Sequence, residues 1–143
     1  MTENTSHTRP YSSVIARLKQ AGLRPTRQRI ALAKLLFEGE NRHVTAEDLH
    51  AEARAAGVSV SLATIYNSLH QFTDAGIMRE VVVEAGRSYF DTNTGDHHHF
   101  FHEDTGSLED IPTELINVSA LPPAPQGKSV QRVDVIVRVS ADD

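Results

Sequence analysis

The stretch SLATIYNSLHQFTDAGIMREVVVEAGRSYF, residues 61–90, is the part of the sequence that decides the fold. Ser61 is a favoured N-cap residue, and Gly76 is typical of the position just after a helix. Between them the apolar side chains recur at helical spacing: Leu62, Ile65, Leu69 and Phe72. The first half of the stretch therefore predicts a helix with one buried face and one polar face.

The second half of the stretch predicts a β-hairpin. Residues 77–83 and 87–90 favour strands, and Gly86 in the turn between them supplies a permissive backbone. Three more helices are predicted upstream, over 11–20, from the N-cap Thr26 to Phe37, and from a capping box at 45–48 to Gly57. Helices followed by such a hairpin predict a winged helix-turn-helix.

Beyond Thr94 the pattern becomes strand-like. In the last strand, VDVIVRVS over 133–140, four valines are expected to share one buried face: Val133, Val135, Val137 and Val139. Three prolines within 121–128 exclude a helix there. We expect a small sheet with at most a short helix, whose thin core a second copy of the chain completes.

These elements predict an α+β fold, with an N-terminal winged helix-turn-helix domain followed by a small α/β dimerisation domain. The DNA-binding domain is expected over residues 1–93, with 1–10 flexible, and the dimerisation and sensory domain over 94–143.

Charge is distributed unevenly along the chain, whose net charge is -5. Residues 9–34 hold seven basic side chains and no Asp or Glu, whereas residues 95–143 hold three basic and nine acidic ones. The basic run is either a solvated helix face or a phosphate-binding one, and composition does not decide between them.

Composition excludes several classes of site. The chain has no cysteine, which excludes disulfides, thiolate zinc sites and cysteine-ligated haem. No apolar run is long enough for a membrane span, and the N-terminus lacks the pattern of a secretion signal, so we expect a cytoplasmic protein without a membrane partner.

Five stretches, in this order and spacing, carry a resemblance to a known family: AGLRPTRQRIAL (21–32), HVTAEDLH (43–50), SLATIYNSLHQFTDAGI (61–77), GRSYFD (86–91) and HHH (97–99). Over about residues 15–111 the chain resembles the ferric uptake regulators. Its lack of cysteine, HHHFF run, proline-rich loop and closing RVDVIVRV are most similar to the iron response regulator branch, whose members are haem-responsive.

The resemblance places Tyr66 in the DNA-recognition helix and Arg24 near the minor groove. Both residue types suit these positions, although an aromatic residue at helical spacing is also a common packing residue. The residues expected to contact DNA are Arg24, Arg27, Arg29, Ser61, Thr64, Tyr66 and Asn67. Many relatives have Arg where this chain has Asn67, whose amide suits adenine, so a different operator is expected.

The resemblance also implies a metal site with ligands from both domains: His43, Asp91, His97, His99 and Asp110. In an extended segment His97 and His99 point to one side and His98 to the other. The donors suit Fe(II), Mn(II) or Zn(II), and the residues expected to bind haem are His97, His98 and His99. A polar loop without a ligand is the alternative. The CxxC pair of many relatives is missing from 102–105, so no structural zinc is expected.

The function expected from the resemblance is regulation of iron and haem metabolism genes by a homodimeric repressor that binds a palindromic operator and is released by haem. One alternative is a regulator of the same family that is corepressed by Mn(II), Fe(II) or Zn(II), or that senses peroxide. A small metal-dependent hydrolase is the alternative of another class, but no cleft-forming segment is recognisable. The target genes, the effector and the sign of regulation stay open.

Overall fold

The computed structural model describes residues 12–143, so the expected flexibility of residues 1–10 lies outside the described residues. The chain divides into two compact units, unit 1 ending at Thr94 and unit 2 running from Gly95 to Asp143. Among the described residues, no helix has the length and apolar character needed to cross a bilayer.

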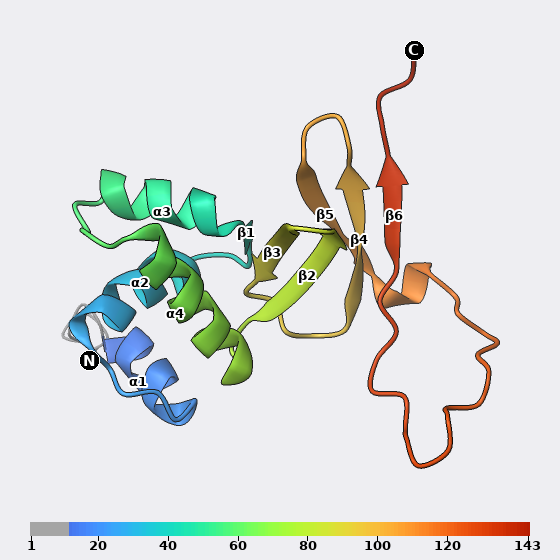
Figure 1. The fold of residues 1–143 in the computed structure, drawn as a ribbon, viewed down its shortest axis with the longest axis horizontal. Helices are drawn as coiled ribbons and strands as arrows, with labels where there is room; N and C mark the ends of the chain where they lie inside the picture. The colour runs from blue at the N-terminus through green and yellow to red at the C-terminus, as the bar shows by residue number, and fades with distance from the viewer. Residues whose placement is uncertain (1–11) are drawn as a thin grey trace, which may run out of the picture. The chain divides into compact units, whose positions relative to one another are not determined.

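Unit 1 combines four helices with a three-stranded antiparallel sheet (Figure 1). The helices are α1 (Ser12–Gln20), α2 (Arg27–Phe37), α3 (Ala46–Ala55) and α4 (Leu62–Asp74). The strands are β1 (His43–Val44), β2 (Arg79–Glu84) and β3 (Arg87–Asp91), in the order β1-β3-β2. Gly86 lies in the β2–β3 turn with a φ of 74°, in the left-handed region that glycine enters without strain. The predicted helices and wing hairpin are confirmed, whereas the short strand β1 was not predicted.

Side-chain caps begin three of these helices. Thr26 accepts a hydrogen bond from the Arg29 backbone, and Ser61 accepts one from the Thr64 backbone. At α3 the predicted capping box is complete, because Thr45 accepts from the backbone N–H of Asp48 while the Asp48 carboxylate accepts from that of Thr45. The helix starts predicted from the sequence are therefore correct.

Replacing Thr45 by alanine should destabilise unit 1 by about 0.5–2 kcal/mol, because the Asp48 backbone N–H loses its side-chain acceptor. Chemical denaturation followed by circular dichroism measures this change. The substitution Ser59→Ala, at an exposed position outside the helices, is the matched control. Equal stabilities of the two variants would contradict the role given to the cap.

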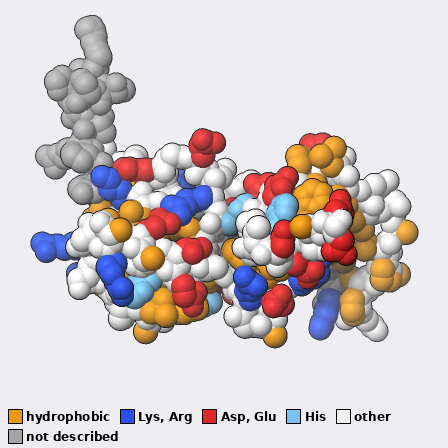
Figure 2. Space-filling model, turned by 90° about the horizontal axis from the view of Figure 1, so that it is seen from above, with side chains coloured by type: hydrophobic (Ala, Val, Ile, Leu, Met, Phe, Trp, Pro, Cys, Tyr) orange, Lys and Arg blue, Asp and Glu red, His pale blue; other side chains and the backbone are white. Residues whose placement is uncertain are grey.

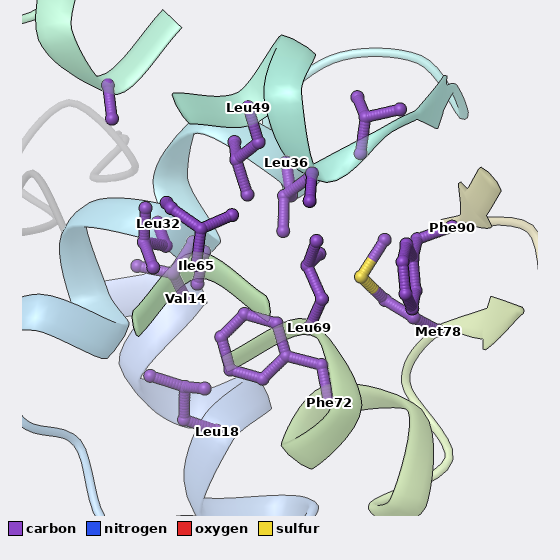
Figure 3. Close-up of a cluster of buried hydrophobic side chains, with 14 residues drawn as sticks. Val14, Leu18, Leu32, Leu36, Leu49, Ile65, Leu69, Phe72, Met78 and Phe90 are labelled. Carbon is purple, nitrogen blue, oxygen red and sulfur yellow. The ribbon is translucent and has the colours of Figure 1, made fainter. Parts of the chain in front are cut away.

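The core of unit 1 lies where the helices meet the start of the wing (Figure 3). Its largest fully buried side chains include Leu18, Leu36, Leu49, Phe72 and Phe90. They come from the apolar stripes of the four helices and from β3. Burial of one face of α4 against this cluster leaves the opposite face, which carries Tyr66 and Asn67, exposed.

Unit 2 is a three-stranded sheet of order β5-β4-β6. Its elements are β4 (His97–His102), β5 (Ser107–Pro112), the 3-10 helix η2 (Thr113–Leu115) and β6 (Ile136–Val139). Strands β4 and β5 are antiparallel, and β4 and β6 are parallel. A long loop connects η2 to β6 (Figure 1), as its prolines predict.

The predicted valine face of the last strand is wrong in part. The strand begins at Ile136 rather than at Val133, and Val137 is 36% exposed. The cause is that β6 pairs only with β4 and forms an edge of the sheet, so alternation along it does not separate a core face from a solvent face.

The exposed large hydrophobic residues of the described chain lie mostly in unit 2. They are Leu115, Val118, Leu121, Val130 and Val137, against Tyr66 and Val82 in unit 1. Figure 2 shows such side chains (orange) on the surface of unit 2, and basic and acidic side chains intermixed on the face of unit 1 that it draws. The surface of unit 1 is therefore not uniformly basic on that face.

Candidate metal centre and nucleic-acid interface

In unit 1, a histidine and a buried aspartate face each other across two strands. Residue His43 of β1 pairs with Asp91 of β3 in the antiparallel register. The Nε2 atom of His43 lies 3.3 Å from Oδ2 of Asp91, whose side chain is only 1% exposed. The other carboxylate oxygen of Asp91 accepts a hydrogen bond from the Asn93 backbone at 2.8 Å. A buried carboxylate is costly without a cation or several donors, so this pair is suited to a positive ion.

The residues beside β1 and β3 hold this pair in place. The Arg42 backbone N–H donates to the Thr92 hydroxyl at 2.9 Å, and the Thr92 backbone N–H donates to the Arg42 carbonyl at 3.0 Å. The Arg42 guanidinium also forms an ion pair with Glu52 of α3, and this hydrogen-bonded partner raises the pKa of Arg42. These bonds fix β1 against β3, which sets His43 opposite Asp91.

In unit 2, two histidines and an aspartate share one side of the sheet. Residue Asp110 of β5 is the cross-strand partner of His99 and the diagonal neighbour of His97. Its Oδ1 atom lies 3.4 Å from Nε2 of His97 and 3.5 Å from Nε2 of His99. The imidazoles are 5% and 2% exposed, and the aspartate is 42% exposed. The three side chains thus converge on one point on one face of the sheet.

The hydrogen bonding of His97 indicates which of its ring nitrogens is suited to bind a metal ion. Its Nδ1 atom lies 2.7 Å from the Gly95 carbonyl, so Nδ1 carries the proton and donates. Nε2 is then the ring nitrogen that faces the Asp110 carboxylate, and either a metal ion between the two groups or a second proton on the ring satisfies both. A carbonyl on the far ring nitrogen is the usual support of a metal-bound imidazole.

The separations between these donor atoms also fit a shared ion. Values of 3.3–3.5 Å are longer than a good N–H···O hydrogen bond. Two ligand atoms about 2.1 Å from one ion, at a tetrahedral angle, lie about 3.4 Å apart. Both the unit 1 pair and the unit 2 trio therefore have ligand-like spacing, and all five residues have donor atoms suited to a metal ion.

His98, the middle histidine of the run, has a structural role. The Nδ1 atom of His98 accepts a hydrogen bond from the Val135 backbone N–H at 3.0 Å, just before β6 begins. The His99 backbone N–H donates to the Val135 carbonyl at 3.2 Å. Since His98 is 7% exposed and points away from His97 and His99, it links β4 to β6. Sequence reasoning predicted the alternation but not this hydrogen bond.

On α4, the residues expected to contact DNA divide into two groups. The side chains of Tyr66 and Asn67 are exposed, and the Tyr66 hydroxyl donates to Oε2 of Glu47 at 3.1 Å. The side chains of Ser61 and Thr64 are joined by a hydrogen bond of 3.0 Å at the start of the helix, where Ser61 is the cap. The first group is exposed, as a contact surface requires, and the second group also has a structural role at the start of the helix.

The three arginines near α2 differ in the same way. Residues Arg24 and Arg27 are exposed. The guanidinium of Arg29 donates to the Arg24 carbonyl at 3.0 Å and to Oε1 of Gln71, on α4, at 2.9 Å. Arg29 therefore ties the segment that carries Arg24 to α4, a role that the sequence pattern does not reveal. His50 of α3 is half-buried, with Nε2 3.1 Å from the Val60 carbonyl.

Helices whose last member, α4, has an exposed polar face, followed in the chain by a two-stranded wing, define a winged-helix protein. In this chain they are joined to a small unit with clustered metal-type donors. Comparison with known proteins identifies it further. The model of the ferric uptake regulator family matches residues 20–136, so the chain belongs to the ferric uptake regulator family. This family consists of transcription regulators and not of enzymes, and the hydrolase alternative is set aside.

Two curated relatives illustrate the match. The chain is 44% identical over 82 residues to the ferric uptake regulation protein of Escherichia coli K12, covering 57% of this chain and 55% of the relative. It is 37% identical over 103 residues to the peroxide-responsive repressor PerR of Staphylococcus aureus, covering 72% of this chain and 69% of the relative. The matched stretch thus spans about half the length of the ferric uptake regulation proteins.

Solved structures extend the similarity over most of the chain. The ferric uptake regulator of Vibrio cholerae superposes with a TM-score of 0.73 at 26% identity, covering 90% of this chain and 99% of that one. The ferric uptake regulator of Pseudomonas aeruginosa with manganese gives a TM-score of 0.67 at 26% identity, covering 94% and 100%. The predicted fold class, a winged-helix domain followed by a small α/β domain of the dimerisation type, is confirmed.

Proposed function

We propose that this chain is a metal-responsive, DNA-binding transcription regulator that acts as a cytoplasmic homodimer. The observation that carries the proposal is the ligand-like spacing of His97, His99 and Asp110, with a carbonyl on the far nitrogen of His97. The names of the relatives support it, since they refer to ferric uptake, to peroxide and to a structure with manganese.

The proposed ligands are the His43 and Asp91 pair of unit 1 together with the His97, His99 and Asp110 trio of unit 2. Neither set alone supplies the ligands that a four- to six-coordinate ion prefers, whereas five donors do. Nitrogen and carboxylate donors without thiolate suit Fe(II), Mn(II) or Zn(II). An ion bound by groups from both units would favour one arrangement of the units over others, and DNA affinity would follow that preference.

The proposed DNA contacts remain those expected from the sequence, with Tyr66 and Asn67 on base edges and Arg24 and Arg27 on the backbone or minor groove. A dimer is supported by the five exposed large hydrophobic residues of unit 2, which association would remove from water. Two-fold symmetry would then present two recognition helices to a palindromic site.

The test begins with selection of duplexes from a random library by the full chain in the presence of Mn(II). Fluorescence anisotropy then measures binding of the selected duplex with Mn(II), Fe(II), Zn(II) or a chelator. We expect one or more of these ions to strengthen binding by about 5- to 150-fold, the usual range of allosteric coupling. Binding that is the same with every ion and with the chelator would contradict metal control.

Release from DNA by haem, as in the iron response regulator branch, is the second candidate. The histidine run and the absence of cysteine favour it as a histidine-ligated form. Against it, all three imidazoles are at most 7% exposed, and the pocket beside His97 and His98 has a volume of about 150 Å³. Pockets for larger organic ligands usually have about 300 Å³ or more. Loss of duplex binding on haem addition, with a histidine-type Soret spectrum, would favour haem over the metal.

Arg24→Ala should weaken binding to the selected duplex and make the slope of log affinity against log salt shallower, by about one for each phosphate that the side chain neutralises. The reason is that an exposed guanidinium near phosphates displaces counterions. Lys128→Ala, an exposed cation in unit 2, is the control and should leave the slope unchanged. An unchanged slope in the Arg24 variant would remove this residue from the DNA interface.

A further inference from the structure

A hydrogen bond joins the recognition helix to α3 on the exposed side of unit 1. The hydroxyl of Tyr66 donates to the carboxylate of Glu47 at 3.1 Å, and both side chains are exposed. Together with His70 and Arg87 they line a groove of about 510 Å³ formed by α4, the start of α3 and the β2–β3 hairpin. The pair therefore stands on the surface that the proposed function directs toward DNA.

The hydrogen bond restricts the ring of Tyr66. The buried face of α4 carries Ile65, Leu69 and Phe72, so packing in the core does not hold the Tyr66 ring, which is 39% exposed. A bond from its hydroxyl to α3 limits the rotation of an otherwise exposed side chain. The Glu47 carboxylate also raises the pKa of the Tyr66 phenol, because its hydrogen bond stabilises the protonated form. The hydroxyl is thereby kept as a donor.

The charge of Glu47 has an effect of its own. Glu47 and Asp48 both lie in the first turn of α3, where a carboxylate interacts favourably with the helix dipole. That interaction does not depend on a contact between Glu47 and the recognition helix. A carboxylate on a surface that approaches phosphates opposes binding to every duplex, whatever its sequence.

We propose that Glu47 is a positioning residue that determines specificity: it holds the Tyr66 ring for base recognition, and its charge lowers the affinity for all duplexes. Strong binding then depends on the correct contact of Tyr66 with a base. This inference rests on the proposed DNA-binding function, and it adds to it a residue that discriminates without itself touching a base.

Four variants of the full chain separate the two effects on the selected duplex and on a scrambled duplex of the same composition. Glu47→Gln keeps an acceptor and removes the charge, so affinity for both duplexes should rise by about three- to tenfold. The ratio of the two affinities, selected over scrambled, should stay nearly the same. Glu47→Ala should raise binding to the scrambled duplex equally but lower the ratio. Tyr66→Phe should lower the ratio alone. The double variant Glu47→Ala/Tyr66→Phe should lower the ratio no further than Glu47→Ala.

Two further measurements exclude a merely structural role. The Tyr66 phenol, followed by NMR of labelled tyrosine, should titrate at lower pH in Glu47→Ala than in the wild type. Glu40→Gln makes the same change in net charge at an exposed loop position and should shift neither affinity by more than about twofold.

The inference is overturned if Glu47→Ala keeps the wild-type ratio, if the effects on the ratio are additive in the double variant, or if Glu40→Gln reproduces the effect of Glu47→Gln. Failure of the wild type to select any duplex would instead overturn the proposed function, and this inference with it.

Discussion

The double variant His97→Ala/His99→Ala is expected to bind the selected duplex equally well with Mn(II) and with a chelator. Both substitutions remove imidazole nitrogens that face Oδ1 of Asp110, so Asp110 is then the one proposed ligand left in unit 2 to couple an ion to that unit. The whole metal stimulation, about 5- to 150-fold in the wild type, should disappear. Anisotropy with and without the ion measures this, and calorimetric titration with Mn(II) measures the loss of binding directly.

His102→Ala is the matched control for this experiment. The residue lies on the same strand, is only half-buried, and has Nε2 3.0 Å from Glu109 rather than from Asp110. It should keep the full response to Mn(II). Because alanine leaves cavities at the two buried positions, the variant His97→Gln/His99→Gln, with comparable melting temperature, serves as a second test. A metal response retained in both double variants would place the sensor elsewhere.

Tyr66→Ala is expected to cause the largest loss of operator binding among the DNA-contact residues. A good base contact is worth about 1–3 kcal/mol, and a dimer on a palindrome makes it twice, so we expect a loss of about 2–6 kcal/mol in binding free energy. Anisotropy with the selected duplex in saturating Mn(II) measures this loss.

Two controls accompany the Tyr66 variant. Its free energy of unfolding should change by no more than about 0.5 kcal/mol, because the side chain is 39% exposed and lies outside the buried face of α4. Its affinity for Mn(II) should stay that of the wild type. Unchanged duplex affinity would move the recognition surface away from the exposed face of α4.

Most of unit 1 was predictable because local rules dominate there. Caps at Thr26, Thr45 and Ser61 depend on residues three positions apart, and the apolar stripe of α4 depends on spacing within one helix. The strand β1 escaped prediction because it has two residues and exists only through its pairing with β3. Such a strand has no periodicity of its own.

The candidate site was likewise predictable where local patterns decide and not where long-range contacts do. Alternation along an extended chain was enough to group His97 with His99 and to separate His98. The hydrogen bonds of Arg29 with Gln71 and of Tyr66 with Glu47 join residues 42 and 19 positions apart. No pattern within a segment encodes contacts of that kind, so they became visible only with the fold.

The alternation along β4 also constrains how this chain can change in length. A one-residue insertion or deletion inside the strand would exchange its two faces, so that one histidine of the run, instead of two, would face Asp110. A change of two residues would restore the faces. Relatives that keep the metal donors are therefore expected to differ inside β4 by even numbers of residues. Single-residue differences should be confined to the segments that flank the strand, residues 93–96 and 104–106, which lie outside the strands.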